Sequence, residues 1–108
     1  MEINDFIEAS IKHGEASKEG DYKLANKNYD KLVSILKYLK ENDSIFILKK
    51  FLIHEDLNVQ LWAATFLLEE NEEEAIKLMT KIANQNIPHY SFDAKITLEE
   101  WKKGNLKW

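Results

Sequence analysis

The feature that most constrains this chain is a run of apolar side chains separated by alternating steps of three and four residues. The run comprises Tyr22, Ala25, Tyr29, Leu32, Leu36 and Leu39. These steps place the side chains on one face of an α-helix, because the helix completes a turn every 3.6 residues. Val33 and Ile35 widen the stripe, which favours packing inside a globular domain over an open coiled coil.

Similar spacing predicts helices along most of the chain. The predicted ranges are 4–18, 21–41, 44–53, 57–69, 72–84 and 91–103, followed by a short C-terminal tail. Asp21, Asp56 and Asn71 are the expected N-caps of three of these helices. Gly104 is expected to end the last helix. Gly14 lies on the apolar face of the first helix, where a glycine permits the close approach of a neighbouring helix.

Six helices with short connections predict one all-α domain built from three antiparallel hairpins. Stacked hairpins would form a short HEAT- or TPR-like α-solenoid, and a compact non-repeat helical bundle is the alternative. A chain of 108 residues, 44% of them apolar and 31% charged, has the size and composition of a single folded domain.

Composition argues against several classes of protein. The chain has no cysteine, so disulfide frameworks and thiolate metal sites are excluded. It lacks an apolar stretch of the roughly 20 residues that span a bilayer, and its acidic start does not resemble a signal peptide. The net charge is −4, and all 15 basic residues are lysines, which is unfavourable for nucleic-acid binding. We therefore expect a cytoplasmic protein that binds neither membranes nor nucleic acids.

One segment resembles a tetratricopeptide repeat. The sequence EGDYKLANKNYDKL, residues 19–32, is similar to the turn and second helix of that repeat, with Gly20, Tyr22, Ala25 and Tyr29 at the expected spacing. The similarity does not extend upstream into the first helix of the repeat.

A second segment, LKKFLIHEDLNVQLWAATFLLEEN (residues 48–71), is similar to a HEAT repeat. Gln60 stands where HEAT repeats usually carry an arginine, so their Asp–Arg ladder is absent. The chain as a whole resembles a family of small bacterial HEAT-like proteins of unknown function. The similarity rests on ANK at residues 25–27, LWAA at 61–64 and the final segment SFDAKITLEEWKKG at 91–104. This resemblance implies a helical-repeat fold and no particular activity.

The predicted helix over residues 57–69 is apolar around most of its circumference. Its narrow polar face carries Asn58, Thr65 and Glu69. Gln60 lies within the apolar arc, so we expect a buried amide that is hydrogen-bonded, either inside the fold between hairpins or to a ligand. Trp62 falls at the border of the arc and is either a residue at the edge of the core or an anchor for a partner protein.

A second candidate for a buried polar residue is Asn26, beside Tyr22 and Tyr29 on the predicted helix 21–41. Its amide could satisfy a backbone group between hairpins or contact a partner.

An acidic cluster follows the helix over residues 57–69. It consists of Glu69, Glu70, Glu72, Glu73 and Glu74. Three of the five would lie in the first turn of the next helix, where carboxylates interact favourably with the helix dipole. The alternative is an acidic surface that attracts a basic partner protein.

Phe92 and Ile96 form an apolar pair one helical turn apart, on the side of the last helix away from its predicted core stripe. Either Leu106 and Trp108 in the tail fold over this pair, or the pair is an apolar surface patch of the kind that marks interfaces. In the second case it would serve a partner protein or a homodimer.

Catalytic motifs are absent from the sequence. His13, His54 and His89 are far apart along the chain and do not form a metal-ligand spacing, so we expect solvated or turn histidines. No catalytic residue, metal site or cofactor is predicted.

These features favour a non-enzymatic protein–protein interaction module. One concrete version is an immunity-type protein that masks a cognate toxin or effector. The alternative is a small-molecule-binding protein or enzyme that uses a groove near Trp62, Gln60 and Asn26.

Overall fold

The computed structural model describes residues 3–106 and Trp108. Within these residues the chain forms six helices and no strands, which confirms the predicted all-α class. The elements are α1 (Ile3–Glu19), α2 (Tyr22–Glu41), the 3-10 helix η1 (Ile45–Ile53), α3 (Leu57–Leu68), α4 (Glu73–Asn84) and α5 (Tyr90–Lys102). The observed bounds differ from the predicted ones by at most one residue at each end. No helix in this described part of the chain is long and apolar enough to cross a bilayer.

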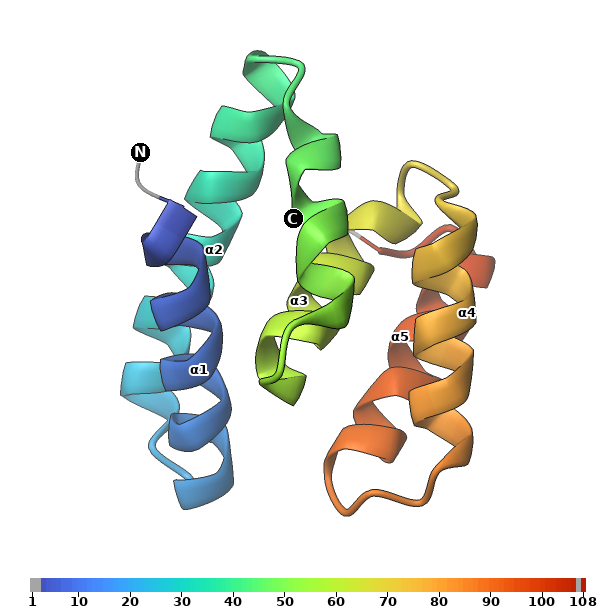
Figure 1. The fold of residues 1–108 in the computed structure, drawn as a ribbon. Helices are drawn as coiled ribbons and strands as arrows, with labels where there is room; N and C mark the ends of the chain where they lie inside the picture. Colours follow the sequence, from blue (N-terminus) through green and yellow to red (C-terminus); the bar gives the residue numbers. More distant parts are fainter. Residues whose placement is uncertain (1–2, 107) are drawn as a thin grey trace.

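The helices are arranged as three hairpins that lie side by side (Figure 1). The pair α1–α2 is on the left, η1–α3 is in the middle and α4–α5 is on the right. Within each pair the two helices pack along each other, and α3 also packs against α1 and α4. The middle hairpin therefore joins the two outer ones, and α3 is the helix that contacts both of them.

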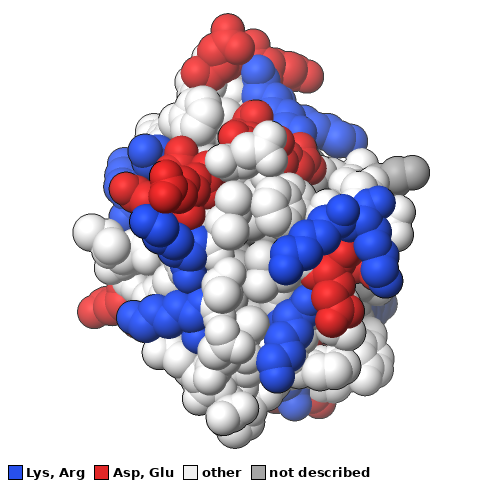
Figure 2. Space-filling model, turned by 90° about the vertical axis from the view of Figure 1, so that its right-hand side faces the viewer, with Lys and Arg blue, Asp and Glu red and all other residues white. Residues whose placement is uncertain are grey.

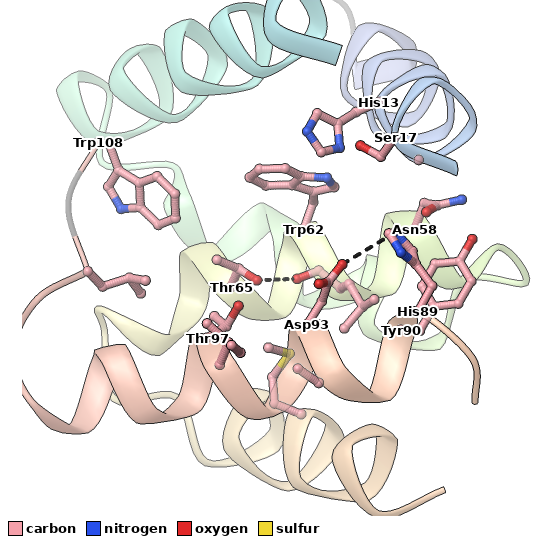
Figure 3. Close-up of a pocket in the computed structure, with 16 residues that line it drawn as sticks. His13, Ser17, Asn58, Trp62, Thr65, His89, Tyr90, Asp93, Thr97 and Trp108 are labelled. Atoms are coloured by element: carbon pink, nitrogen blue, oxygen red, sulfur yellow. Dashed lines mark hydrogen bonds and ion pairs between the residues drawn. The ribbon is translucent and has the colours of Figure 1, made fainter. Parts of the chain in front are cut away.

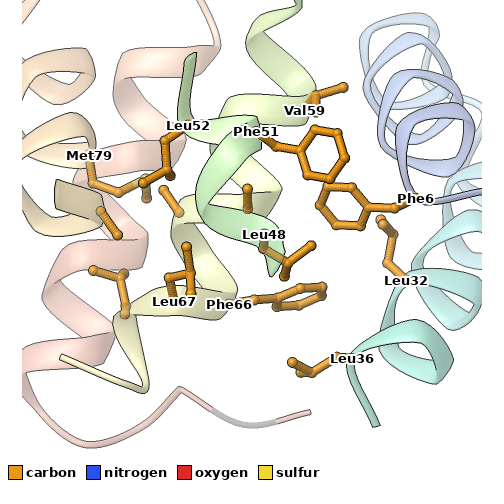
Figure 4. Close-up of a cluster of buried hydrophobic side chains, with 14 of the residues drawn as sticks. Phe6, Leu32, Leu36, Leu48, Phe51, Leu52, Val59, Phe66, Leu67 and Met79 are labelled. Carbon is orange, nitrogen blue, oxygen red and sulfur yellow. The ribbon is translucent and has the colours of Figure 1, made fainter. Parts of the chain in front are cut away.

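The apolar core fills the space between the hairpins (Figure 4). Phe6 of α1 contacts Phe51 of η1 and Phe66 of α3, with ring centroids 5.4 and 6.4 Å apart. Leu32 of α2 and Leu67 of α3 are completely buried in the same cluster. Each such side chain contributes about 1.5–3 kcal/mol when it leaves water.

Local capping interactions set where several helices begin. The side chain of Asp21 accepts a hydrogen bond from the backbone N–H of Leu24, and that of Asp56 accepts one from the N–H of Asn58, as expected for N-caps. The prediction for Asn71 is wrong: it lies in the turn with a φ of 53°, and Glu72 caps α4 instead. An asparagine tolerates the left-handed region better than most residues do. Asn71 therefore forms part of the turn before α4 and does not cap that helix.

Gly14 allows α1 to approach α3 closely. A β-carbon at this position would lie 2.0 Å from the side-chain oxygen of Asn58 on α3, a distance that no pair of non-bonded atoms tolerates. The prediction that Gly14 serves a close helix–helix contact is therefore confirmed. Both residues also line a groove at the surface of the molecule.

Candidate functional site

A groove of about 300 Å³ lies between α1, α3 and α5, and the C-terminal tail closes one end of it. We call it the α3 groove, because α3 forms its floor. Figure 3 shows side chains from all three helices and from the tail pointing into it. This volume is at the lower end of the range for ligand pockets, so the groove can hold a few side chains or a small molecule.

The floor of the α3 groove follows from the sequence of α3. Asn58, Leu61, Trp62 and Thr65 line it, and residues at this spacing share one helix face. Sequence analysis placed Asn58 and Thr65 on a polar face, and that face is turned toward the groove. The Thr65 hydroxyl donates a hydrogen bond to the carbonyl of Leu61 at 2.6 Å, a bond within its own helix that leaves the lone pairs of the oxygen available.

Trp62 is the aromatic centre of the groove. Its ring is half-buried and stands edge-on to the imidazole of His13, at a centroid distance of 5.0 Å. The ring centroid of Tyr29 on α2 lies 6.0 Å from the ring centroid of Trp62, and that of Trp108 in the tail lies 6.4 Å from it. Trp62 is thus a residue at the edge of the core that also presents part of its ring to an open groove.

Two histidines and a carboxylate meet at the groove, although they are distant in the sequence. His13 comes from α1, and the Nε2 atom of His89 lies 3.4 Å from a carboxylate oxygen of Asp93 on α5. Burial lowers the pKa of His13, and the nearby His89 lowers it further, whereas Asp93 acts in the opposite direction. The expectation of solvated or turn histidines is wrong for His13, which is partly buried and packs on Trp62.

The sequence of α5 carries a signal for this wall of the groove. Tyr90, Asp93, Ala94 and Thr97 line the groove at the same spacing as the residues of the α3 floor. The apolar residues of α5 define the core stripe that the sequence predicts. The polar residues one position away, Asp93 and Thr97, mark the side of this stripe that borders the groove.

Gln60 and Asn26 do not line the α3 groove. The Gln60 side-chain amide is half-buried and donates a hydrogen bond to the carbonyl of His54 at 2.5 Å. The bond stays within the η1–α3 hairpin, so Gln60 does not bridge hairpins through it. The prediction of a buried Asn26 is wrong, since Asn26 is exposed and the buried amide of α2 is that of Asn28.

The acidic cluster is divided between several roles. Glu69, at the end of α3, pairs with Lys40 of α2 and accepts a hydrogen bond from the indole of Trp108. Glu72 caps α4 and lies 3.7 Å from Lys49 of η1. Glu73 pairs with Lys77 one turn along the helix at 3.2 Å.

The two remaining members of the cluster, Glu70 and Glu74, are exposed. Two of the five residues, Glu73 and Glu74, lie in the first turn of α4 rather than three. Some residues of the cluster thus cap α4 or form ion pairs with lysines of other helices. The others form a smaller exposed acidic surface.

Phe92 and Ile96 remain at the surface, with exposed fractions of 66% and 44%. The tail does not cover them, because Trp108 packs against Trp62 and Phe66 instead. Ile96 lies on the rim of the α3 groove. Figure 2 shows a band of uncharged surface between lysines and carboxylates on the face that carries α4 and α5.

Metal binding finds no basis in residues 3–106 and 108. No three histidine, aspartate or glutamate side chains there gather closely enough to hold an ion. The His13, His89 and Asp93 side chains can donate or accept hydrogen bonds at the groove wall.

No protein-family model, curated protein or solved structure matches the chain. The resemblance to helical-repeat proteins stays a prediction. The functional assignment rests on the α3 groove and the surfaces around it.

Proposed function

We propose that this protein is a non-enzymatic interaction module that binds a segment of a partner protein in the α3 groove. The observation that supports this most directly is that Trp62 and Tyr90 both border a hollow that the core does not fill. Tryptophan and tyrosine are enriched among the residues that dominate binding energy at protein interfaces. Polar side chains between them, such as Thr65 and Thr97, would orient the bound segment.

A protein segment suits this groove because apolar surface continues beyond its rim. Ile96 lines the groove, and Phe92 lies one turn earlier on α5 with most of its ring in solvent. Side chains four residues apart share a helix face. A partner that fills the groove would therefore also cover Phe92, whereas a small molecule confined to 300 Å³ would leave it exposed.

The charge distribution favours a basic partner. The chain carries a net charge of −4, and the carboxylate of Asp93 is exposed on the groove wall. Glu70 and Glu74 add an exposed acidic surface near the far end of α3. Such charges act more on the encounter rate than on the affinity. A cytoplasmic immunity-type protein, which masks a cognate toxin or effector, is one form of this proposal and is supported by analogy of class.

The test is capture of partners from a lysate of the source cells with two matched variants. Thr97→Arg places a bulky charge on the groove wall, and Thr80→Arg places the same group on the exposed surface of α4. We expect the wild type and Thr80→Arg to capture equal amounts of the same identified partner. The amount captured by Thr97→Arg should be at least tenfold lower. Equal recovery by all three proteins would contradict the proposal.

Small-molecule binding is the second candidate, and the convergence of His13, His89 and Asp93 on the groove supports it. These groups could bind a polar ligand through hydrogen bonds, as few well-placed polar groups do in apolar pockets. In this case a ligand from a metabolite library would raise the melting temperature of the wild type but not of Thr97→Arg. No partner protein would then depend on the groove.

A further inference from the structure

Two residues of the C-terminal tail, Leu106 and Trp108, lie at the α3 groove. Gly104 adopts a φ of +75° just after α5, which a glycine does without strain. Its N–H donates to the carbonyl of Trp101 at 3.0 Å, and the N–H of Asn105 donates to that of Glu100 at 2.8 Å. These bonds end the helix and turn the chain back, so that Leu106 and Trp108 reach the groove.

Trp108 occupies a site that matches the chemistry of an indole. Its ring meets the ring of Phe66 edge-on, with centroids 5.1 Å apart and an interplanar angle of 87°, and also contacts Trp62. Its N–H donates to the carboxylate of Glu69, which Lys40 holds in place. An apolar aromatic wall and one hydrogen-bond acceptor are what a partly buried tryptophan needs.

The tail separates two hollows of the surface. Leu106 and Trp108 line the α3 groove on one side, and on the other they line a shallower depression with Leu36, Lys40 and Glu69. Both tail residues are half-buried, and neither belongs to a helix. A segment with few buried contacts opens at lower free energy than the core does. If the tail were displaced, the groove and the depression would join.

We propose that the site formed by Trp62, Phe66 and Glu69 is a subsite for a tryptophan of the partner protein, which Trp108 fills in the free protein. The partner segment would carry an aliphatic residue two positions before its tryptophan, as Leu106 precedes Trp108. This inference rests on the proposed function of the α3 groove. Because the tail is attached to the domain, it competes at an effective concentration in the millimolar range, so the partner must gain further contacts along the groove.

The test uses the full chain with the substitutions Leu106→Ala and Trp108→Ala, which empty the subsite. The probe is a peptide with blocked ends and the sequence KGNLKW of residues 103–108, and the control is the same peptide with alanine in place of its tryptophan. We expect the double variant to bind the probe at least tenfold more tightly than the wild type does, with NMR shifts at Trp62 and Phe66. The control peptide should not bind.

Glu69→Gln tests the hydrogen bond to the indole. In the double variant it should weaken binding of the peptide several-fold, because the amide oxygen of glutamine still accepts the bond but lacks the charge that strengthens it. If the double variant does not fold, Trp108→Phe replaces it. This variant keeps a ring but loses the indole N–H, so its tail should be displaced more easily and the peptide should bind more tightly than to the wild type.

Three results would overturn the assignment. One is a folded variant that shows no peptide-induced shifts at Trp62 and Phe66. Another is peptide binding to Trp108→Phe that is no tighter than to the wild type. The third is a concentration-dependent dimer of the wild type that Trp108→Ala abolishes, because the occupant would then be the tail of a second copy.

The outcome separates this inference from the proposed function. If the peptide binds as predicted but Thr97→Arg captures every protein as well as the wild type does, the tryptophan subsite is supported and the proposed partner is wrong. If capture depends on Thr97 and is unchanged by Trp108→Phe, only the tryptophan subsite is wrong.

Discussion

The two sides of α3 differ in what fills the space beside them. On the core side, Val59, Ala63 and Leu67 are fully buried among apolar side chains of the other hairpins. On the groove side, Leu61 and Trp62 are only half-buried and border a hollow of about 300 Å³. The helix is thus fully buried on one side and only partly buried on the other. Apolar side chains that border unfilled space at the surface are available for binding.

Substitutions on the two sides of α3 should have very different effects on stability. We expect Leu67→Ala to lower the free energy of unfolding by about 2–5 kcal/mol, because it removes buried methyl groups and leaves a cavity in the core. Leu61→Ala, on the groove side of the same helix, should cost less than half as much. Urea unfolding of both variants measures the difference. Similar losses would mean that the groove side is packed as tightly as the core.

The closest contact at the groove rim should respond to a substitution that adds a single carbon. Gly14→Ala is expected to destabilise the protein by about 1 kcal/mol, because its β-carbon would overlap the terminal amide of Asn58 and force that side chain out of its rotamer. Adding Asn58→Ala should remove the overlap. The double variant should then be at least as stable as Asn58→Ala alone, since alanine favours a helix over glycine by about 1 kcal/mol.

A double-mutant cycle with thermal or urea unfolding gives the coupling between these two positions. Additive effects would show that α1 and α3 do not meet through Gly14 and Asn58.

The smallest expected effect is a pH dependence from the groove side. Because burial lowers the pKa of His13 below its usual value of 6.5, the unfolded chain binds the proton more readily than the folded protein does. Stability from this residue is therefore present above pH 6.5 and declines as the pH falls below that value. Unfolding at pH 7.5 and 5.5 should show a smaller loss in His13→Gln than in the wild type. An identical loss in both proteins would assign the pH dependence to other groups.

Much of the helical structure could be predicted from sequence because the signals are local. The three-and-four spacing of residues 22–39 indicated α2, and Asp21 and Asp56 marked helix starts through bonds to backbone groups two or three residues away. The candidate site was predicted less well. Trp62 was recognised as a border residue, whereas His13, Asp93 and Thr97 were not recognised as groove residues, because they approach each other through helix packing.

The assignment of Asn26 failed for a similar reason. Helical spacing places a residue near the edge of a stripe, but a rotation of the helix by a fraction of a turn decides whether it is covered. In α2 the covered amide is that of Asn28, and Asn26 faces solvent. Helical periodicity locates the edge of a buried face with an uncertainty of about one residue per turn. It therefore cannot decide whether a single polar side chain at that edge is buried or exposed.

By itself the sequence determined the all-α class and the bounds of the helices, since both depend on periodicity and capping over a few residues. The tertiary structure decided which side of α3 stays unfilled and that His13 and His89, which are 76 positions apart in the sequence, line the same groove. It also decided that Trp108 packs on Phe66 rather than over Phe92. These outcomes depend on how closely α1, α3 and α5 approach one another. That distance is set by side-chain volumes at contacts such as Gly14 with Asn58, which no local pattern contains.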